Sequence, residues 1–155
     1  MLENLLADFT DPFPVLAWET ALMRLGIAIL LGGLIGFERE VHDKPAGLRT
    51  NMLVSLAACL FAILAFELVA MSPVDDGSLE ADPLRLVEAV TAGVAFLAAG
   101  SIITAGGSVK GLTTGAGMWM AGAVGLAVGI GEVLLAGIAT AVALVVLWIF
   151  RIMEP

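Results

Sequence analysis

Charged residues are scarce in this chain of 155 residues, at 14% of the total, against roughly 25% in an ordinary soluble domain. Hydrophobic residues make up 60%, and the mean hydropathy is +1.04. This composition excludes an ordinary soluble domain and indicates an integral membrane protein. Because each bilayer crossing needs about 20 apolar residues, the length allows around five spans with short loops, in a single membrane domain over residues 1–155.

Basic residues are also few, with 7 Lys and Arg against 15 Asp and Glu, which gives a net charge of −8. Nucleic-acid binding needs a basic face, so we expect no nucleic-acid partner and take the lipid bilayer as the surroundings. The single cysteine, Cys59, excludes an intrachain disulfide. It lies in an apolar run, and we interpret it as a packing residue.

The parts of a catalytic site are missing as well. The only histidine, His42, lies in a predicted loop, every Asp lies outside the apolar runs, and Cys59 has no His near it in the sequence. Nucleophilic and paired-carboxylate chemistry therefore lack their residues, and the spacing of a His and Cys metal site is absent. We expect no enzyme, no catalytic residue and no cofactor, and leave Mg²⁺ binding and its ligands open.

Five apolar stretches predict transmembrane helices over about residues 18–37, 48–70, 84–104, 113–130 and 133–152. Pro83 suits the first turn of the third helix, where a proline costs no hydrogen bond. Only Gly131 and Glu132 separate the last two helices, which predicts a tight helical hairpin. The predicted fold class is all-α: a polytopic membrane protein that forms a compact bundle of five helices.

The basic residues indicate the orientation of this bundle. One set of alternating helix ends holds five of them, whereas the opposite set holds only Arg85 and most of the acidic loop residues. Basic residues favour the cytoplasmic side, so we predict an outside N-terminus and an inside C-terminus. The five are Arg39, Lys44, Arg49, Lys110 and Arg151.

Residues 35–51, IGFEREVHDKPAGLRTN, place six charged residues and His42 between two long apolar runs. Glu38 follows the first span and Arg49 opens the second, so we expect their side chains to pair and fasten the two helix ends. Pro45 and Gly47 predict a sharp bend between them. Thr113 or Thr114 is expected nearby as the N-terminal cap of the fourth helix. The alternative is a solvated loop.

Three charged residues fall inside the predicted spans: Arg24, Glu67 and Glu88. Counted from the helix ends, all three lie at a similar depth beneath the outer surface, so we expect them to meet in a cluster. Intramembrane charges are candidates for functional sites. We expect Arg24 to pair with Glu67, which leaves Glu88 either protonated or bound to a cation. A purely structural ion pair is the alternative.

Two GxxxG pairs, Gly32 with Gly36 and Gly125 with Gly129, stand in the first and fourth spans. Small residues allow the backbones of membrane helices to approach closely. Packing within the chain is favoured over a dimer face, because GxxxG is a weak signal by itself. A homo-oligomer is left open.

Several blocks in fixed order resemble the MgtC/SapB family of bacterial inner-membrane proteins. They are RLGIAILLGGLIGFERE at residues 24–40, KPAGLRT at 44–50, FLAAG at 96–100 and GLTTGAGMW at 111–119. Two positions depart from the family pattern: Asn51 stands where the family commonly has a His, and AFLAAG stands for GFLGAG. The sequence stops at Pro155, where many relatives continue into a soluble cytoplasmic domain, so we expect the membrane domain only.

The resemblance implies a multi-pass protein of the bacterial inner membrane with a role in magnesium homeostasis and adaptation to low magnesium, in a family linked to virulence. It implies a regulatory or accessory protein that acts on another membrane complex. A small transporter or channel for Mg²⁺, H⁺ or Na⁺ is the alternative. The residues of the expected cytoplasmic motif are Glu38, Arg39, Glu40, Lys44, Pro45, Gly47, Arg49, Thr50, Thr113 and Thr114.

Overall fold

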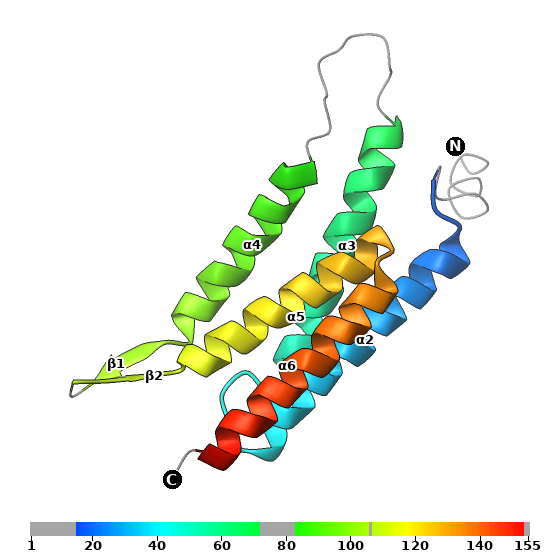
Figure 1. Cartoon of the computed structure of the whole chain (residues 1–155). Coiled ribbons are helices and arrows are strands. Elements are labelled where there is room, and N and C mark those ends of the chain that lie inside the picture. Colours follow the sequence, from blue (N-terminus) through cyan, green and yellow to red (C-terminus); the bar gives the residue numbers. More distant parts are fainter. Residues whose placement is uncertain (1–14, 72–82, 106, 154–155) are drawn as a thin grey trace.

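The computed structural model describes residues 15–71, 83–105 and 107–153. Within them the chain forms five helices and one two-stranded hairpin (Figure 1). The predicted all-α bundle is confirmed, and the short hairpin is an addition to it. In chain order the elements are α2 (Trp18–Val41), α3 (Leu48–Met71), α4 (Pro83–Gly100), β1 (Ile103–Ala105), β2 (Ser108–Lys110), α5 (Leu112–Ile130) and α6 (Val133–Met153).

Helices α2, α3 and α5 are each long and apolar enough to cross a membrane, and α6 contains a shorter apolar stretch, Val133–Ile149. Since α2 and α3 have 24 residues each, they extend about 36 Å at 1.5 Å per residue. The hydrocarbon core of a bilayer is about 30 Å thick. Figure 1 shows α2 beginning at one end of the bundle and α6 ending at the other.

Two predicted boundaries were wrong. Helix α2 continues to Val41 instead of ending near residue 37, so Glu38, Arg39 and Glu40 belong to its last turns and not to the connection. Helix α4 ends at Gly100 instead of residue 104. Beyond it, Ile103 pairs antiparallel with Lys110, and the β-branched residues of this segment favour a strand.

Helix α3 packs against α2 on one side and α5 on another. The α2 contact depends on glycine. A Cβ atom added at Gly32 would lie 2.5 Å from the Ser55 Cβ, and one added at Gly36 would lie 2.7 Å from the Leu48 Cα. No larger residue fits at these positions, because the backbones of α2 and α3 are already in contact.

The same arrangement holds between α5 and α3. A Cβ added at Gly125 would lie 2.7 Å from the Ser55 Cα, and one added at Gly129 would lie 2.6 Å from the main-chain oxygen of Cys59. Both GxxxG pairs therefore serve contacts within the chain, which confirms the predicted intramolecular packing. Cys59 is fully buried at this contact, as expected of a packing residue.

Helix α4 lies to one side of this three-helix centre (Figure 1). It packs on α5, where a Cβ added at Gly122 would lie 2.9 Å from the Val94 Cγ2. Its contact with α3 is much smaller. This asymmetry leaves an open groove between α3 and α4.

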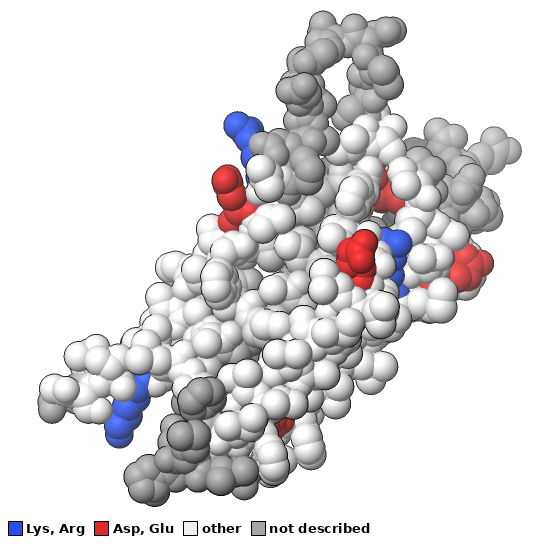
Figure 2. Space-filling view, viewed as in Figure 1, with Lys and Arg blue, Asp and Glu red and all other residues white. Residues whose placement is uncertain are grey.

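Charged side chains gather toward the two ends of the molecule in the view of Figure 2, and a broad uncharged band separates them. Large apolar side chains are exposed along the helices, among them Leu30, Phe96 and Leu134. Such a band is what the hydrocarbon core of a bilayer requires of the residues that face it. The fold and this surface identify a membrane protein.

Candidate functional site

The α2–α3 junction, which consists of the last turn of α2, residues 42–47 and the first turn of α3, is held by side chains from both helices. The Glu40 carboxylate accepts a hydrogen bond of 2.9 Å from the main-chain N–H of Leu48, the first residue of α3. The first N–H groups of a helix lack partners within it, so Glu40 acts as their cap. A Cβ added at Gly47 would collide with this carboxylate, and this close approach is the reason for glycine there.

Asn51 holds the junction from the α3 side. Its Nδ2 donates hydrogen bonds to the main-chain oxygens of Ala46 at 2.6 Å and Gly47 at 2.9 Å, and only 1% of the residue is exposed. The bend expected at Pro45 and Gly47 exists, but the left-handed residues in it are Asp43 (φ 51°) and Ala46 (φ 55°). Asn51 fixes this shape through the two carbonyls.

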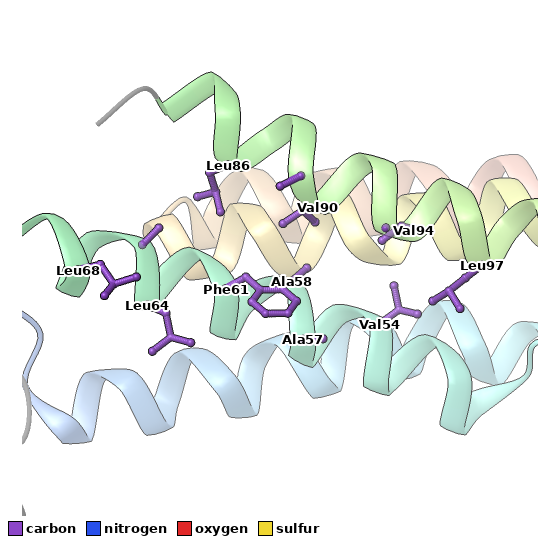
Figure 3. Close-up of a pocket in the computed structure, with 13 residues that line it drawn as sticks. Val54, Ala57, Ala58, Phe61, Leu64, Leu68, Leu86, Val90, Val94 and Leu97 are labelled. Atoms are coloured by element: carbon purple, nitrogen blue, oxygen red, sulfur yellow. The ribbon is translucent and has the colours of Figure 1, made fainter. Parts of the chain in front are cut away.

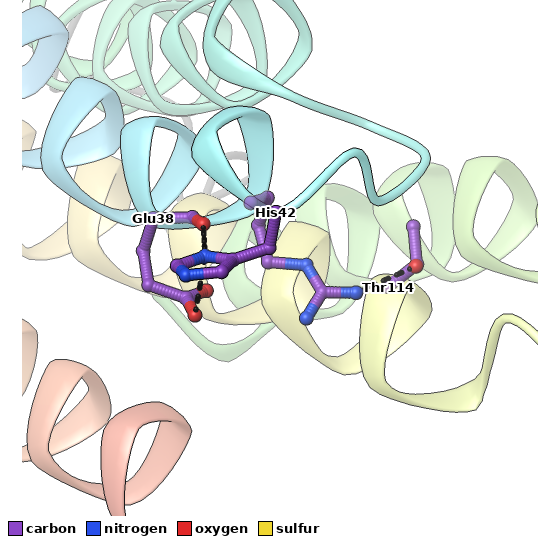
Figure 4. A network of polar contacts seen from close by, with 4 residues as sticks. Glu38, His42 and Thr114 are labelled. Carbon is purple, nitrogen blue, oxygen red and sulfur yellow. Dashed lines mark hydrogen bonds and ion pairs between the residues drawn. The ribbon is translucent and has the colours of Figure 1, made fainter. Parts of the chain in front are cut away.

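Glu38 interacts with His42, one turn later on α2 (Figure 4). The His42 Nδ1 donates to the main-chain oxygen of Glu38 and lies 3.4 Å from its Oε1. Among residues 15–71, 83–105 and 107–153 it is the one contact within 4.0 Å between a basic and an acidic side chain, and it is an ion pair only when His42 is protonated. The predicted pair of Glu38 with Arg49 is therefore wrong: α2 runs past Glu38 and brings His42 beside it, while Arg49 is exposed on α3.

Arg39 is the buried cation of the junction, with 7% of it exposed. Its Nη2 donates a hydrogen bond of 2.9 Å to the Oγ1 of Thr114 on α5, so it joins α2 to α5 (Figure 4). The predicted capping role of Thr113 or Thr114 is wrong. The residue before α5 is Gly111, in a left-handed conformation (φ 90°), with no side-chain cap, and Thr113 is exposed.

Four buried polar atoms near this junction have no hydrogen-bond partner among the described residues: Glu38 Oε2, Arg39 Nε, Asn51 Oδ1 and Ser55 Oγ. Asn51 and Ser55 lie one turn apart on α3, where they face Gly32 and Gly36 of α2. Unpaired polar atoms inside a protein are costly. The remaining motif residues, Lys44, Pro45 and Thr50, are exposed at the same end of the bundle.

Arg24, one of the three charges expected inside the membrane, binds the main chain of α5. Its Nη1 donates a hydrogen bond of 2.7 Å to the carbonyl oxygen of Gly129, in the last turn of α5, which ends at the left-handed Gly131 (φ 102°). The last carbonyls of a helix lack partners within it, and a positive charge is favoured at this end. Arg24 therefore stabilises the C-terminus of α5.

Glu67 takes the complementary position beside the start of α2. Its carboxylate accepts hydrogen bonds from the main-chain N–H groups of Val15, at 3.3 Å, and Leu16, at 3.0 Å, and 4% of it is exposed. No ion pair joins Arg24 to Glu67, given that His42 with Glu38 is the one such pair in the described part of the chain. The expected direct pairing of these two residues was thus wrong, because Arg24 binds the C-terminal end of α5 and Glu67 binds the main chain just before α2.

Glu88 is exposed on α4, and the functional role of the three charges stays a prediction. Sequence reasoning overlooked Asn51 and Ser55 as parts of the junction. Their signal is a pair of polar residues four positions apart at the start of the long apolar run of α3. Two positions this far apart share a helix face, and that face meets the glycines of α2.

Comparison with known proteins places these features in a family. The sequence profile of the MgtC family matches residues 25–155. Protein MgtC of Brucella abortus is 42% identical over 113 residues, which are 73% of this chain and 44% of that protein. Protein SapB of Bacillus subtilis is 40% identical over 111 residues, or 71% of this chain and 47% of that protein.

A third relative, named putative magnesium transporter YhiD of Escherichia coli, is 35% identical over 131 residues, or 84% of this chain and 60% of that protein. No solved structure matches the chain. The matched part covers somewhat less than half the length of the MgtC and SapB relatives. The family profile covers most of the present sequence, including the α2–α3 junction and Thr114. The chain belongs to the MgtC family.

Proposed function

We propose that this protein is a regulatory or accessory membrane protein of magnesium homeostasis, which acts on another membrane complex in adaptation to low magnesium. Its family membership supports the link to magnesium, since one relative is named a putative magnesium transporter. The proposed location is the bacterial inner membrane, which the chain crosses several times with the α2–α3 junction on the cytoplasmic side. It is proposed to act without catalysing a reaction.

One observation carries the regulatory proposal: Arg24 and Glu67 are both engaged in hydrogen bonds to main-chain groups of other segments. Arg24 binds the carbonyl of Gly129, and Glu67 binds the N–H groups of Val15 and Leu16. A transported cation needs carboxylate or carbonyl oxygens that are free to exchange their ligands. The Glu67 oxygens and the Arg24 guanidinium already bind main-chain groups. This arrangement suits a structural role better than the binding sites of an ion-transport path.

The packing around α3 supports the same conclusion. The glycine contacts bring the backbones of α2, α3 and α5 together along the middle of the bundle. Interiors packed this closely deform little, and even one added methyl group changes the stability of the protein. A rigid centre with large apolar outer faces suits a protein that binds others within the membrane.

A small cation transporter is the second candidate. The unpartnered atoms Asn51 Oδ1 and Ser55 Oγ favour it, since buried oxygens without a donor are available to a cation. The name of the Escherichia coli relative points in the same direction. Both oxygens lie on α3 against α2, so a transport path through them would require α2 and α3 to separate.

Ion flux distinguishes the two functions. The full chain is reconstituted in sealed vesicles, and the movement of Mg²⁺, Na⁺ and H⁺ is followed with dyes enclosed in the vesicles. We expect no flux above that of vesicles without protein. Mg²⁺ flux that Ser55→Ala abolishes, and that the exposed control Thr50→Ala leaves intact, would establish the transporter and overturn the regulatory proposal.

The regulatory proposal has its own positive test in cells. Expression of the chain in a bacterial strain without its MgtC-family protein should restore growth in low magnesium, and Arg39→Gln should remove this rescue without lowering the amount of protein in the membrane. If the Arg39→Gln variant still restores growth in low magnesium, the α2–α3 junction is not required for the proposed function.

A further inference from the structure

The groove between α3 and α4 has a volume of about 530 Å³ and is lined by 13 residues (Figure 3). All of them are Val, Ala, Phe, Leu or Gly. Phe61 on α3 and Val90 on α4 mark its middle in Figure 3. A second groove, between α4 and α5, is smaller at about 320 Å³ and includes the polar side chain of Thr91. The larger groove is therefore the purely hydrocarbon one.

The α3–α4 groove is shorter than the hydrocarbon core of a bilayer. On α4 it extends from Leu86 to Leu97 and on α3 from Val54 to Leu68, which is about 16 Å and about 21 Å at 1.5 Å per residue. The hydrocarbon core is about 30 Å thick. A transmembrane helix as occupant would need the full thickness, so the groove matches the acyl chain of a lipid better than a partner helix.

The width of the occupant leads to the same choice. A helix is at least about 10 Å wide with its side chains, whereas an acyl chain is far narrower and can lie within the groove. Because water gains nothing from an apolar wall, lipid hydrocarbon is also favoured over water as the filling.

A positively charged side chain at the end of the groove suits an anionic headgroup. Arg85 lies in the first turn of α4, directly before Leu86 and four positions before Ala89, both of which line the groove. Residues four positions apart share a helix face. Arg85 is exposed and forms no ion pair within the described part of the chain. The N-terminal end of a helix also favours negative charge, so an anionic phosphate suits this position.

We propose that the α3–α4 groove binds a phospholipid of the leaflet at the N-terminal end of α4, with one acyl chain along Phe61 and Val90 and the phosphate beside Arg85. Glu88, three residues further on, does not line the groove and takes no part in the binding. The small Gly93 in the groove wall leaves room for the chain, since a Cβ added there meets nothing within 4 Å.

Photo-crosslinking tests this proposal on the full chain in lipid nanodiscs. The probe is phosphatidylglycerol with a diazirine in the middle of one acyl chain, present in trace amounts, and peptide mass spectrometry locates the labelled residues. We expect the label to concentrate on groove residues of α3 and α4 above the level on the exposed α6 residues Leu134 and Val142. Equal labelling of both surfaces would show ordinary surrounding lipid only and would overturn the proposal.

Gly93→Leu should fill the groove and lower its labelling several-fold, while the labelling of α6 stays unchanged. The matched control is Gly137→Leu on α6, where an added Cβ also meets nothing within 4 Å; it should leave the groove labelling intact. Unchanged groove labelling in Gly93→Leu would contradict the proposal. A dimer seen by native mass spectrometry and lost in Gly93→Leu would assign the groove to a second copy instead.

Arg85→Gln tests the phosphate separately from the acyl chain. It should lower labelling by the phosphatidylglycerol probe about fivefold, which corresponds to about 1 kcal/mol for one basic side chain near a membrane surface. A diacylglycerol probe with the same chains, which lacks a phosphate, should label Arg85→Gln and the unmodified protein equally. Equal losses with both probes would mean that Arg85 shapes the groove and does not contact phosphate.

Discussion

Arg39 on α2 and Thr114 on α5, 75 positions apart in the sequence, share a buried hydrogen bond of 2.9 Å. The bond ties together two helices that both pack on α3, at the end of the bundle where α2 turns into α3. Arg39 has a further buried nitrogen, Nε, without a partner in the described part of the chain. Within the described residues, Thr114 is thus the one recorded hydrogen-bond acceptor for the side chain of Arg39.

Thr114→Val should destabilise the protein, because the similar shape of valine keeps the packing and removes the acceptor from Arg39. A buried donor left without a partner costs about 1–3 kcal/mol, and we expect a loss in this range in the free energy of unfolding, measured in mixed detergent micelles. The control is Thr113→Val at the exposed neighbouring position, expected within about 0.5 kcal/mol of the unmodified protein. Equal effects of the two substitutions would contradict the assigned role of the bond.

The bundle could be predicted from the sequence because its signals are local. Apolar runs of about 20 residues indicate helices that span a bilayer, and Pro83, Gly131 and the polar loops mark where they begin and end. The presence of close glycine contacts was also predictable, because small residues four positions apart indicate close helix packing. Gly32 and Gly125 both contact α3. This choice of partner helix depends on the three-dimensional arrangement of the helices and could not be predicted from the sequence pattern.

The partners of the charged residues were largely mispredicted because the reasoning paired side chains with side chains. Arg24 and Glu67 instead bind main-chain groups at helix ends, and these partners are invisible in a list of charged residues. Glu38 was paired with Arg49 on the assumption that α2 had ended. Four more residues of helix brought His42 within reach of Glu38 and removed Arg49 from consideration.

Gly32→Ala should destabilise the contact of α2 with α3. The added Cβ would lie 2.5 Å from the Ser55 Cβ and 2.7 Å from the main-chain oxygen of Asn51, so one helix must move away. Overpacking of this kind typically costs about 1–3 kcal/mol. Gly26→Ala, on the same helix, meets nothing within 4 Å and should gain about 0.5–1 kcal/mol from better helix propensity. Unfolding measurements that rank the two variants in the opposite order would refute the close contact.

Asn51→Ala should loosen the α2–α3 junction, since the carbonyls of Ala46 and Gly47 lose their shared donor. We expect a loss of about 1–3 kcal/mol, together with faster amide hydrogen exchange in residues 42–47. Arg49→Ala serves as the control on the exposed face of the same helix and should stay within about 0.5 kcal/mol. An effect of Arg49→Ala as large as that of Asn51→Ala would restore a structural role for Arg49 at the junction.

Arg24 and Glu67 allow a direct test of whether these two charges act as a pair. They bind different main-chain groups, Arg24 the carbonyl of Gly129 and Glu67 the N–H of Leu16 just before α2. Substitutions at sites that share no partner add within about 0.3–0.5 kcal/mol. In a double-mutant cycle with Arg24→Met and Glu67→Leu, we therefore expect each single change to destabilise the protein and the coupling energy to remain below about 0.5 kcal/mol.

The two single substitutions should also act at different places. Hydrogen exchange in Arg24→Met should increase at the α5–α6 turn, where the carbonyl of Gly129 loses its donor, whereas Glu67→Leu should affect the residues before α2, whose N–H groups lose their acceptor. A coupling energy above about 1 kcal/mol, in the range measured for residues in one network, would instead show that the charges stabilise each other across the bundle. Opening of both regions by either substitution would lead to the same conclusion.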